Sequence, residues 1–213
     1  MDLFDTFNPS KEEIAKDVYL LRRFALQESE HLLLADLHAV INQAPLRNMM
    51  TKMGFAMSAA MTNCGDLGWI SDYNGYRYDT NDPQTGKLWP TMPKSFVQIA
   101  QNVAASCSFQ NFVPDACLIN QYQIGASMGL HQDKNELDFS QPIVSISLGI
   151  DAVFQFGGLK RSDKTLKIKL HHSDIVVWGR EARLKFHGIL PLKASHHDAL
   201  GAYRYNLTFR KAG

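Results

Sequence analysis

The stretch MGLHQDKNELDFSQPIVSISLGI, residues 128–150, passes from a polar segment into an apolar run rich in β-branched residues. The run PIVSISLGI (142–150) has the length and residue types of a buried strand. Similar runs, separated by turn residues, occur on both sides of it after residue 112: CLINQY (117–122), AVFQF (152–156), LKIKL (166–170), DIVVWG (174–179), KFHGI (185–189) and YRYNLTFR (203–210). Several short strands in about 100 residues predict a sandwich, a barrel or a jelly roll.

The part of the chain before residue 112 has a different pattern. VYLLRRF (18–24) predicts one strand, whereas residues 28–43 carry apolar side chains at helical spacing and predict an amphipathic helix that ends before Pro45. Residues 45–90 are rich in Met and aromatic side chains and predict short strands and loops. A second helix is predicted to start at residue 93. Its apolar face consists of Phe96, Ile99, Ala100 and Val103. The predicted fold class is therefore mainly β with flanking helices (α+β).

The formal net charge of the 213 residues is +1, which does not by itself indicate a nucleic-acid partner. The charge is unevenly distributed, however. Residues 1–100 hold nine Lys and Arg against twelve Asp and Glu, while residues 158–193 hold nine against three. A local basic field can attract an anion even when the total charge is near zero.

The three cysteines, Cys64, Cys107 and Cys117, form no CxxC pair and predict free thiols in a reducing compartment. The N-terminal residues show no secretory apolar region, and no run of 18 apolar residues predicts a membrane span. We therefore expect a cytoplasmic protein that does not enter a membrane.

A metal site is the sharpest interpretation of His131 and Asp133. In a strand, residues i and i+2 face the same side, so these two would present an imidazole and a carboxylate together. HxD alone is short and common, and a pair without metal is the plain alternative. A second histidine would complete the two-histidine, one-carboxylate set of non-haem Fe(II) oxygenases, which leaves three metal positions open.

The spacing of the chain favours His187 as that second histidine, because it lies near the start of an apolar strand, 54 residues after Asp133. Several intervening strands could bring it back across a barrel. Spacing leaves open the other histidines, which lie on the early helix or in turns and loops: His31, His38, His171, His172, His196 and His197.

The C-terminal strand RYNLTFR (204–210) carries a second candidate site. Arg204, Asn206, Thr208 and Arg210 share one parity, and the apolar residues share the other. One interpretation is a solvated polar face. The other is a face directed into a barrel, where buried arginines need anionic partners such as carboxylates. In the strand before HQD, Asn120 and Tyr122 share a face and could bind the same small acid.

These motifs together resemble the AlkB family of Fe(II)- and 2-oxoglutarate-dependent dioxygenases, which reverse alkylation damage on nucleic-acid bases. The matching motifs are N-x-Y-x-x-G (120–125), HQD (131–133), FQFGGLKR (154–161), FHGI (186–189) and RYNLTFR (204–210). They occur in family order over nearly the whole chain. MTNCGDLGW (61–69) and DPQTGKLWP (82–90) also resemble the bacterial branch of the family.

The resemblance implies a double-stranded β-helix, or jelly roll, with an N-terminal lid that recognises the nucleotide. It divides the chain into an extension packed on the core (1–44), the lid (45–90) and the dioxygenase core (91–213). The implied iron ligands and catalytic residues are His131, Asp133 and His187. The implied 2-oxoglutarate residues are Asn120, Tyr122, Arg204, Asn206 and Arg210, with Arg210 on the distant carboxylate. The implied substrate residues are Trp69, Tyr76, Arg77, Tyr78, Asn135 and Arg161.

The activity implied by the resemblance is oxidative removal of alkyl groups from bases such as 1-methyladenine and 3-methylcytosine. The cosubstrates are 2-oxoglutarate and O2, and the products are the repaired base, formaldehyde, succinate and carbon dioxide. The expected partner is alkylated DNA, single- or double-stranded, with RNA as a further candidate, and the expected state is a monomer. Three alternatives remain: an oxygenase acting on a protein or small molecule, an anion-binding jelly roll, and a hydrolytic zinc site.

Two residues depart from the bacterial pattern of this family. Asn135 stands in HQDKNE where a carboxylate is usual, and Ser127 stands where a lysine is usual. An aspartate would attract the positive charge of a cationic lesion, whereas Asn135 can only hydrogen-bond. We therefore expect a weaker preference for cationic over neutral lesions, and one phosphate contact fewer at Ser127.

Overall fold

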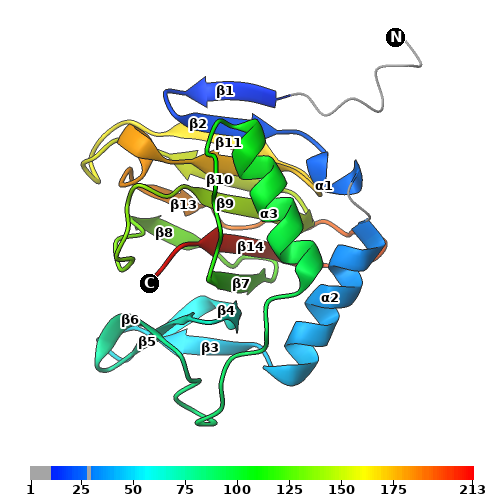
Figure 1. Cartoon of the computed structure of the whole chain (residues 1–213), viewed down its shortest axis with the longest axis vertical. Helices are drawn as coiled ribbons and strands as arrows, with labels where there is room; N and C mark the ends of the chain where they lie inside the picture. Colours follow the sequence, from blue (N-terminus) through cyan, green and yellow to red (C-terminus); the bar gives the residue numbers. More distant parts are fainter. Residues whose placement is uncertain (1–10, 28–29) are drawn as a thin grey trace.

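The computed structural model describes residues 11–27 and 30–213, and in these residues two β-sheets form the body of the molecule (Figure 1). The larger sheet has eight strands, in spatial order β1 (Lys11–Ala15), β2 (Val18–Leu21), β12 (Ile175–Trp178), β9 (Ile143–Gly149), β14 (Arg204–Arg210), β7 (Ala116–Tyr122), β4 (Ala56–Gly65) and β3 (Arg47–Met50). The smaller sheet has the order β11 (Leu166–Leu170), β10 (Ala152–Phe156), β13 (His187–Ile189) and β8 (Met128–His131). The hairpin β5 (Gly68–Asp72) and β6 (Gly75–Asp79) is separate from both sheets.

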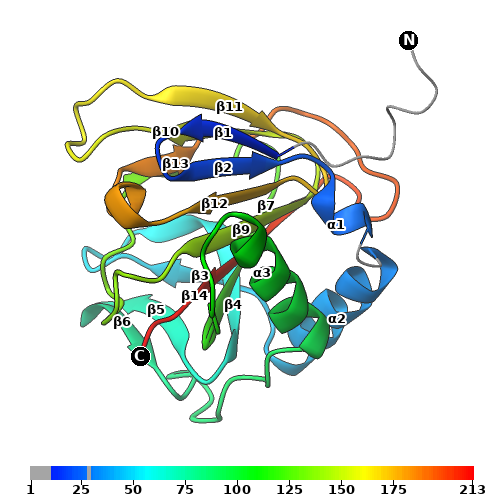
Figure 2. The ribbon, with the colours of Figure 1, turned by 45° about the horizontal axis from the view of Figure 1, so that its top comes forward.

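The helices cover one face of the larger sheet. In both Figures 1 and 2, α2 (Glu30–Gln43) and α3 (Lys94–Ser106) lie side by side on that face. Two shorter helical segments, α1 (Phe24–Gln27) and the 3-10 turn η1 (Arg180–Ala182), connect strands. The apolar face predicted for α3 is confirmed, because Phe96, Ile99 and Val103 are fully buried.

Alternating side chains of the central strands serve two different layers. Val144, Ile146 and Leu148 of β9 pack under the helices, and so do Leu207 and Phe209 of β14. The opposite faces of these strands look toward the smaller sheet, where a second core holds Phe154, Phe156 and Trp178. This pattern follows from the two-residue period of a strand. It gives a β-rich jelly roll with flanking helices, as the sequence predicted.

The strand predicted at residues 18–24 is three residues too long. β2 ends at Leu21, and Arg23 has a φ of +54°, after which α1 begins. The turn is fixed by Asp174, which accepts hydrogen bonds from Arg22 Nη1 at 2.6 Å and from the backbone N–H of Arg23 at 3.1 Å. A carboxylate distant in sequence thus ends the strand, and the local pattern contains no sign of it.

The remaining predicted elements agree with the structure to within a few residues. The early helix is described from Glu30, because residues 28 and 29 of the predicted span lie outside the described part of the chain. β1 was not predicted. β3 lies in the segment 45–90, for which short strands were predicted without bounds, and β8 was implied only by the placement of His131 on a strand. No described helix has both the length and the apolar composition needed to cross a membrane.

Candidate active site

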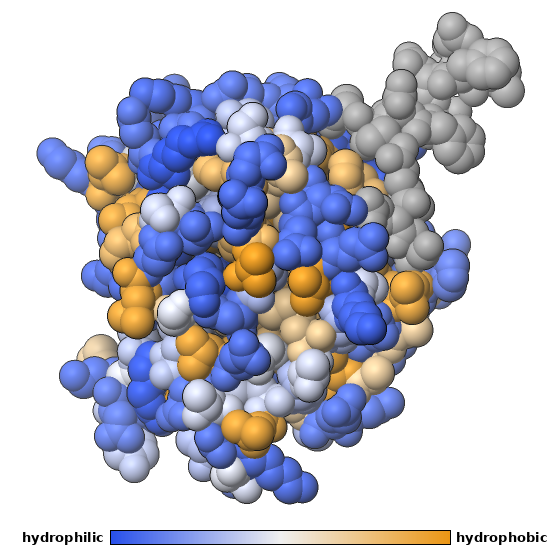
Figure 3. Space-filling model, viewed as in Figure 1, coloured by the Kyte–Doolittle hydropathy of each residue, from blue (hydrophilic) through white to orange (hydrophobic). Residues whose placement is uncertain are grey.

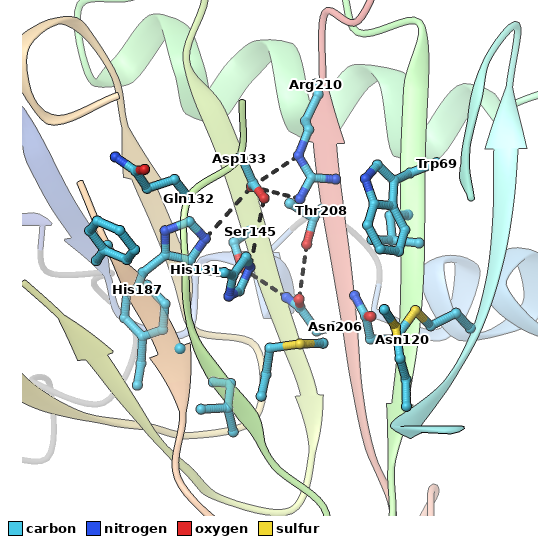
Figure 4. A pocket seen from close by; sticks show the side chains of 18 of the residues that line it. Trp69, Asn120, His131, Gln132, Asp133, Ser145, His187, Asn206, Thr208 and Arg210 are labelled. Atoms are coloured by element: carbon cyan, nitrogen blue, oxygen red, sulfur yellow. Dashed lines mark hydrogen bonds and ion pairs between the residues drawn. The ribbon is translucent and has the colours of Figure 1, made fainter. Parts of the chain in front are cut away.

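A cavity of about 400 Å³ lies on the inner face of the larger sheet, where it faces the smaller one (Figure 4). The larger sheet contributes polar side chains from β7, β9 and β14, including Asn120, Ser145 and Asn206. The smaller sheet contributes two histidines, and the hairpin β5–β6 contributes aromatic rings. The polar face of β14 is therefore buried in the protein, and its interpretation as a solvated face is wrong.

The three residues proposed as metal ligands converge in this cavity. His131 Nε2 lies 3.7 Å from Asp133 Oδ1, and His187 Nε2 lies 3.6 Å from Asp133 Oδ2. One ligand atom from each residue lies within 4.8 Å of the others. His131 and His187 are register partners in the antiparallel pair β8–β13, which explains how residues far apart in sequence meet.

The hydrogen bonds of both histidines leave Nε2 free to bind a metal. Nδ1 of His131 donates to the Gly129 carbonyl at 2.9 Å, and Nδ1 of His187 donates to the Lys185 carbonyl at 3.1 Å. A metal-bound histidine usually donates its other N–H in this way. Burial, and then the neighbouring His187, lower the pKa of His131 to about 4, so its imidazole is neutral near pH 7.

A second group of two histidines and a carboxylate, Glu30, His172 and His197, has the opposite hydrogen bonding. The backbone N–H of Gly149 donates to Nδ1 of His172 at 2.9 Å, and that of Ala199 donates to Nδ1 of His197 at 3.3 Å. Each Nε2 must then carry the proton, and His172 Nε2 donates to Glu30 Oε1 at 2.5 Å. This group is occupied by its own hydrogen bonds, whereas the group around Asp133 presents three metal-binding lone pairs.

Asp133 does not lie on a strand, contrary to the reasoning from HxD. β8 ends at His131, and Asp133 follows in a loop. The loop is held from outside the strand, because Arg183 Nη1 donates to the Asp133 carbonyl at 2.8 Å. Arg210 donates to Asp133 Oδ2 from Nη2 at 2.7 Å and from Nε at 3.1 Å. Burial raises the pKa of Asp133, but Arg210 and the two histidines outweigh it and hold that pKa well below its usual range.

Arg204 is a buried cation without a carboxylate partner among the residues described. Its side chain lines the cavity and is almost fully buried, with Nη2 donating to Ser147 Oγ at 3.0 Å. Nε and Nη1 have no hydrogen-bond partner within the described part of the chain, and neither has Asn120 Oδ1. Burial lowers the pKa of Arg204, and the Tyr122 hydroxyl partly offsets this. A buried guanidinium in this state is suited to an anionic ligand.

The proposed substrate residues divide into two groups. Trp69, Tyr76, Asn135 and Arg161 line the cavity, and the rings of Trp69 and Tyr76 stack with centroids 5.7 Å apart. Trp69 Nε1 donates to Asn135 Oδ1 at 3.4 Å. Arg161 donates to the Leu130 carbonyl and lies over the ring of Phe186.

Arg77 and Tyr78 are not part of the cavity lining. The Arg77 guanidinium makes a two-pronged ion pair with Asp72, with both N–O distances at 3.0 Å. The Tyr78 hydroxyl donates to Glu136 Oε1 at 2.7 Å, behind the cavity.

Sequence reasoning did not identify Ser145, Trp178, Glu136 or Arg183 as site residues. Ser145 is the register partner of Thr208, so it follows from the parity of β14 once the strand order is known. The Trp178 ring packs 4.9 Å from that of His187. Glu136 and Arg183 are buried and paired, but their sequence neighbours give no signal of this.

A family comparison, a comparison with curated proteins and a comparison with solved structures agree with one another. Residues 17–210 match the family described as the 2OG-Fe(II) oxygenase superfamily. The chain is 52% identical over 213 residues to the Alpha-ketoglutarate-dependent dioxygenase AlkB of Escherichia coli, covering 100% of this chain and 98% of that protein. It is 33% identical over 132 residues to the Nucleic acid dioxygenase ALKBH1 of Mus musculus, covering 62% of this chain and 33% of that protein. A solved structure described as "The structure of OsALKBH1" has a TM-score of 0.79 at 27% identity, covering 95% of this chain and 100% of that one.

Proposed function

This chain belongs to the AlkB family within the 2OG-Fe(II) oxygenase superfamily, and we propose that it removes alkyl groups oxidatively from damaged nucleic-acid bases. The enzyme is a dioxygenase that uses Fe(II), 2-oxoglutarate and O2. The observation that carries the proposal is one cavity that combines the His131, Asp133 and His187 donors with the buried Arg204 and the stacked Trp69 and Tyr76.

His131, Asp133 and His187 are proposed to hold the iron, since two imidazoles and a carboxylate are the donor set of non-haem Fe(II) oxygenases. Fe(II) with 2-oxoglutarate and O2 supplies the oxidation that hydroxylates the N-alkyl carbon, after which a methyl lesion is released as formaldehyde, with succinate and carbon dioxide as co-products. Arg210 contributes by fixing the Asp133 carboxylate, and the Gly129 and Lys185 carbonyls fix the two rings.

Asn120, Tyr122, Arg204, Asn206 and Arg210 are proposed to hold 2-oxoglutarate, with the two arginines in different roles. Sequence resemblance put the distant carboxylate on Arg210. We now assign it to Arg204, because Arg210 is already bonded to Asp133 and thus lies at the metal end of the cavity. The free Nε and Nη1 of Arg204, with the hydroxyl of the nearby Tyr122, match a carboxylate at the other end.

The substrate base is proposed to enter beside Trp69. A base in a duplex must leave the stack to reach such a cavity, and alkylation on a Watson–Crick nitrogen lowers the cost of doing so. Trp69 and His131 both line the cavity and are proposed to contact the two faces of the base, with Asn135 near its polar edge. Tyr76 supports the indole by stacking, while Arg77 and Tyr78 act from outside the cavity.

The β10–β11 hairpin is proposed to contact the phosphate backbone. Lys160, Lys164 and Lys167 are exposed on it, and Arg161 lies at the point where the hairpin meets the cavity. Charged side chains along such a track neutralise phosphates without regard to sequence. DNA, single- or double-stranded, is the proposed substrate, with RNA as a further candidate.

Several broader assignments are proposals of the same kind. Residues 45–90 are assigned to the lid, although β3 and β4 also extend the larger sheet, and residues 91–213 to the core. Residues 1–44 are assigned to an extension of the core, and its strands β1 and β2 form the edge of the larger sheet. Residues 1–10 and 28–29 lie outside the described part. Buried, unpaired cysteines support a cytoplasmic enzyme. A monomer is proposed as well; on the face drawn in Figure 3, hydrophobic side chains lie among hydrophilic ones.

The activity is tested by measuring formaldehyde and succinate released from an oligonucleotide with one 1-methyladenine or 3-methylcytosine. Equal amounts of the two products, dependent on Fe(II) and O2, are expected. Succinate without formaldehyde, across methylated DNA and RNA, would indicate an oxygenase with a protein or small-molecule substrate. Product formation with zinc and without O2 would indicate hydrolysis, and 2-oxoglutarate binding without any turnover would indicate an anion-binding protein.

A further inference from the structure

Three buried charged residues and the half-buried Asp133, one of the proposed metal ligands, form a chain of alternating sign. Arg183 Nη2 lies 3.2 Å from Glu136 Oε2, Glu136 Oε1 lies 3.3 Å from Arg210 Nε, and Arg210 Nη2 lies 2.7 Å from Asp133 Oδ2. The Glu136 carboxylate contacts both arginines and, unlike that of Asp133, is not a proposed metal ligand. The Arg183 contact is an ion pair without good hydrogen-bond direction, since Glu136 Oε2 accepts no hydrogen bond from a described residue.

Glu136 also receives a hydrogen bond from the lid. The Tyr78 hydroxyl, on β6, donates to Glu136 Oε1, the same oxygen that faces Arg210. Among the described residues, β5 and β6 pair with no other strand. Hydrogen bonds of Trp69 and Ser71 join the hairpin to β4 and β3, and Tyr78 joins it to Glu136. Trp69, on β5, also makes a longer contact to the adjacent Asn135.

From this arrangement we propose that Glu136 is a positioning residue for the metal centre. It holds Arg210 in the orientation that fixes the Asp133 carboxylate, and through Tyr78 it makes that orientation depend on the position of the hairpin. The proposal rests on the proposed function for the identity of the ligand under the lid.

The charges around Arg210 support a role of Glu136 in orienting that guanidinium, beyond any contribution to the stability of the fold. A guanidinium between two carboxylates is held from both sides, and removing one leaves it free to turn toward the other. Arg210 would then pair with Asp133 alone, and Arg183 would keep its backbone carbonyl partners but lose its carboxylate partner. Residues that orient metal ligands typically change metal affinity 10- to 100-fold when they are replaced. By linkage, a ligand that strengthens the contact between Tyr78 and Glu136 must then raise metal affinity, and the metal must strengthen binding of that ligand to the same extent.

The test measures Co2+ binding to the protein by calorimetry, in the presence of 2-oxoglutarate and with or without a methylated oligonucleotide. Glu136→Gln keeps the shape and an acceptor for Tyr78 but removes the charge, and we expect a Co2+ dissociation constant at least about tenfold higher, with an altered Co2+ absorption spectrum. Tyr78→Phe removes only the hydroxyl, and we expect the oligonucleotide to strengthen Co2+ binding less than it does in the wild type. Tyr73→Phe removes an exposed hydroxyl from the same hairpin and is the matched control.

The outcomes separate this proposal from the proposed function. Wild-type Co2+ affinity and spectrum in Glu136→Gln would overturn the positioning role, whatever the substrate is. Wild-type coupling in Tyr78→Phe would overturn the link to the hairpin. If Glu136→Gln fails to fold in a thermal melt, Tyr78→Phe, which removes another contact of Glu136 Oε1, still decides whether the hairpin acts on the metal centre. If the oligonucleotide fails to bind the wild type, the proposed function fails, while the effect of Glu136→Gln on Co2+ remains decisive.

Discussion

At the scale of single residues, two arginines on one strand have different environments and therefore different expected roles. Arg204 and Arg210 are both buried on the cavity face of β14, but only Arg210 has carboxylate partners among the described residues. The strand period predicted that they share a face. It could not show which end of the cavity each occupies, because that depends on where Asp133 lies.

The assignment of the distant carboxylate predicts a ligand-specific effect of Arg204→Met. Charge-assisted hydrogen bonds contribute about 1.5–3 kcal/mol each, so the dissociation constant of 2-oxoglutarate should rise at least about tenfold. Binding of 2-oxobutyrate, which lacks the distant carboxylate, should change much less. Anaerobic calorimetry with Mn2+ measures both. Equal weakening for the two acids would contradict the assignment, and Arg210→Met is the comparison expected to weaken both.

Asn135 predicts a weaker preference for cationic over neutral lesions, and we expect one substitution to restore that preference. Asn135→Asp adds a negative charge at the exposed edge of the cavity, next to Trp69. Two unit charges 4 Å apart in water attract by about 1 kcal/mol, so the rate on cationic 3-methylcytosine should rise about fivefold relative to a neutral etheno-adduct. Competition kinetics on paired oligonucleotides gives the ratio. An unchanged ratio would refute the prediction.

At the scale of secondary-structure elements, the hydrophobic pattern predicted most strands after residue 112 well. It did not predict where β2 ends. Burial alternates along β10, whereas β14 is buried throughout because its apolar face packs under the helices and its polar face lines the cavity. β2 was predicted too long because the contact that ends it comes from Asp174, 153 residues beyond Leu21. The HxD argument placed His131 on a strand but gave no bounds for β8, because the four residues MGLH are too few to show a clear alternation.

The β10–β11 hairpin predicts salt-dependent binding of single-stranded DNA. Each phosphate neutralised should contribute about −0.7 to the slope of log affinity against log salt. Replacing Lys164 and Lys167 with Gln should make the slope shallower by about 1.4 in fluorescence anisotropy titrations, if each contacts one phosphate. Lys169→Gln is the control, because that ammonium already pairs with Asp151 at 3.0 Å. If replacement of Lys164 and Lys167 leaves the slope unchanged, the hairpin is not part of the DNA-binding surface.

The contact between α2 and the core predicts a loss of stability in acid. Burial lowers the pKa of His172 below its usual 6.5, and His197 lowers it further, against the opposing effect of Glu30. Below pH 6.5 the unfolded chain therefore takes up the proton before the folded chain does, and the free energy of unfolding falls. His172→Asn keeps an acceptor for the Gly149 N–H but does not titrate. Urea unfolding between pH 7 and 5 should show a steeper fall for the wild type, and parallel curves would contradict this.

At the scale of the whole molecule, the fold brings together groups that the sequence keeps apart. His131 and Asp133 were recognised from their spacing, but the choice of His187 over six other histidines depended on family resemblance. The reason is physical, since β8 and β13 become neighbours only when the smaller sheet forms. The competing group around His172 is distinguished by hydrogen-bond direction at Nδ1, which no sequence pattern encodes.

The most direct test of the central claim is anaerobic Fe(II) and 2-oxoglutarate titration, followed by O2 and a methylated oligonucleotide, on the wild type, His187→Ala and His172→Ala. One tightly bound Fe(II) per chain, with matched formaldehyde and succinate, is predicted for the wild type and for His172→Ala. His187→Ala should lose both the bound iron and the products. Retained iron and turnover in His187→Ala, or their loss in His172→Ala, would contradict the site built on His131, Asp133 and His187.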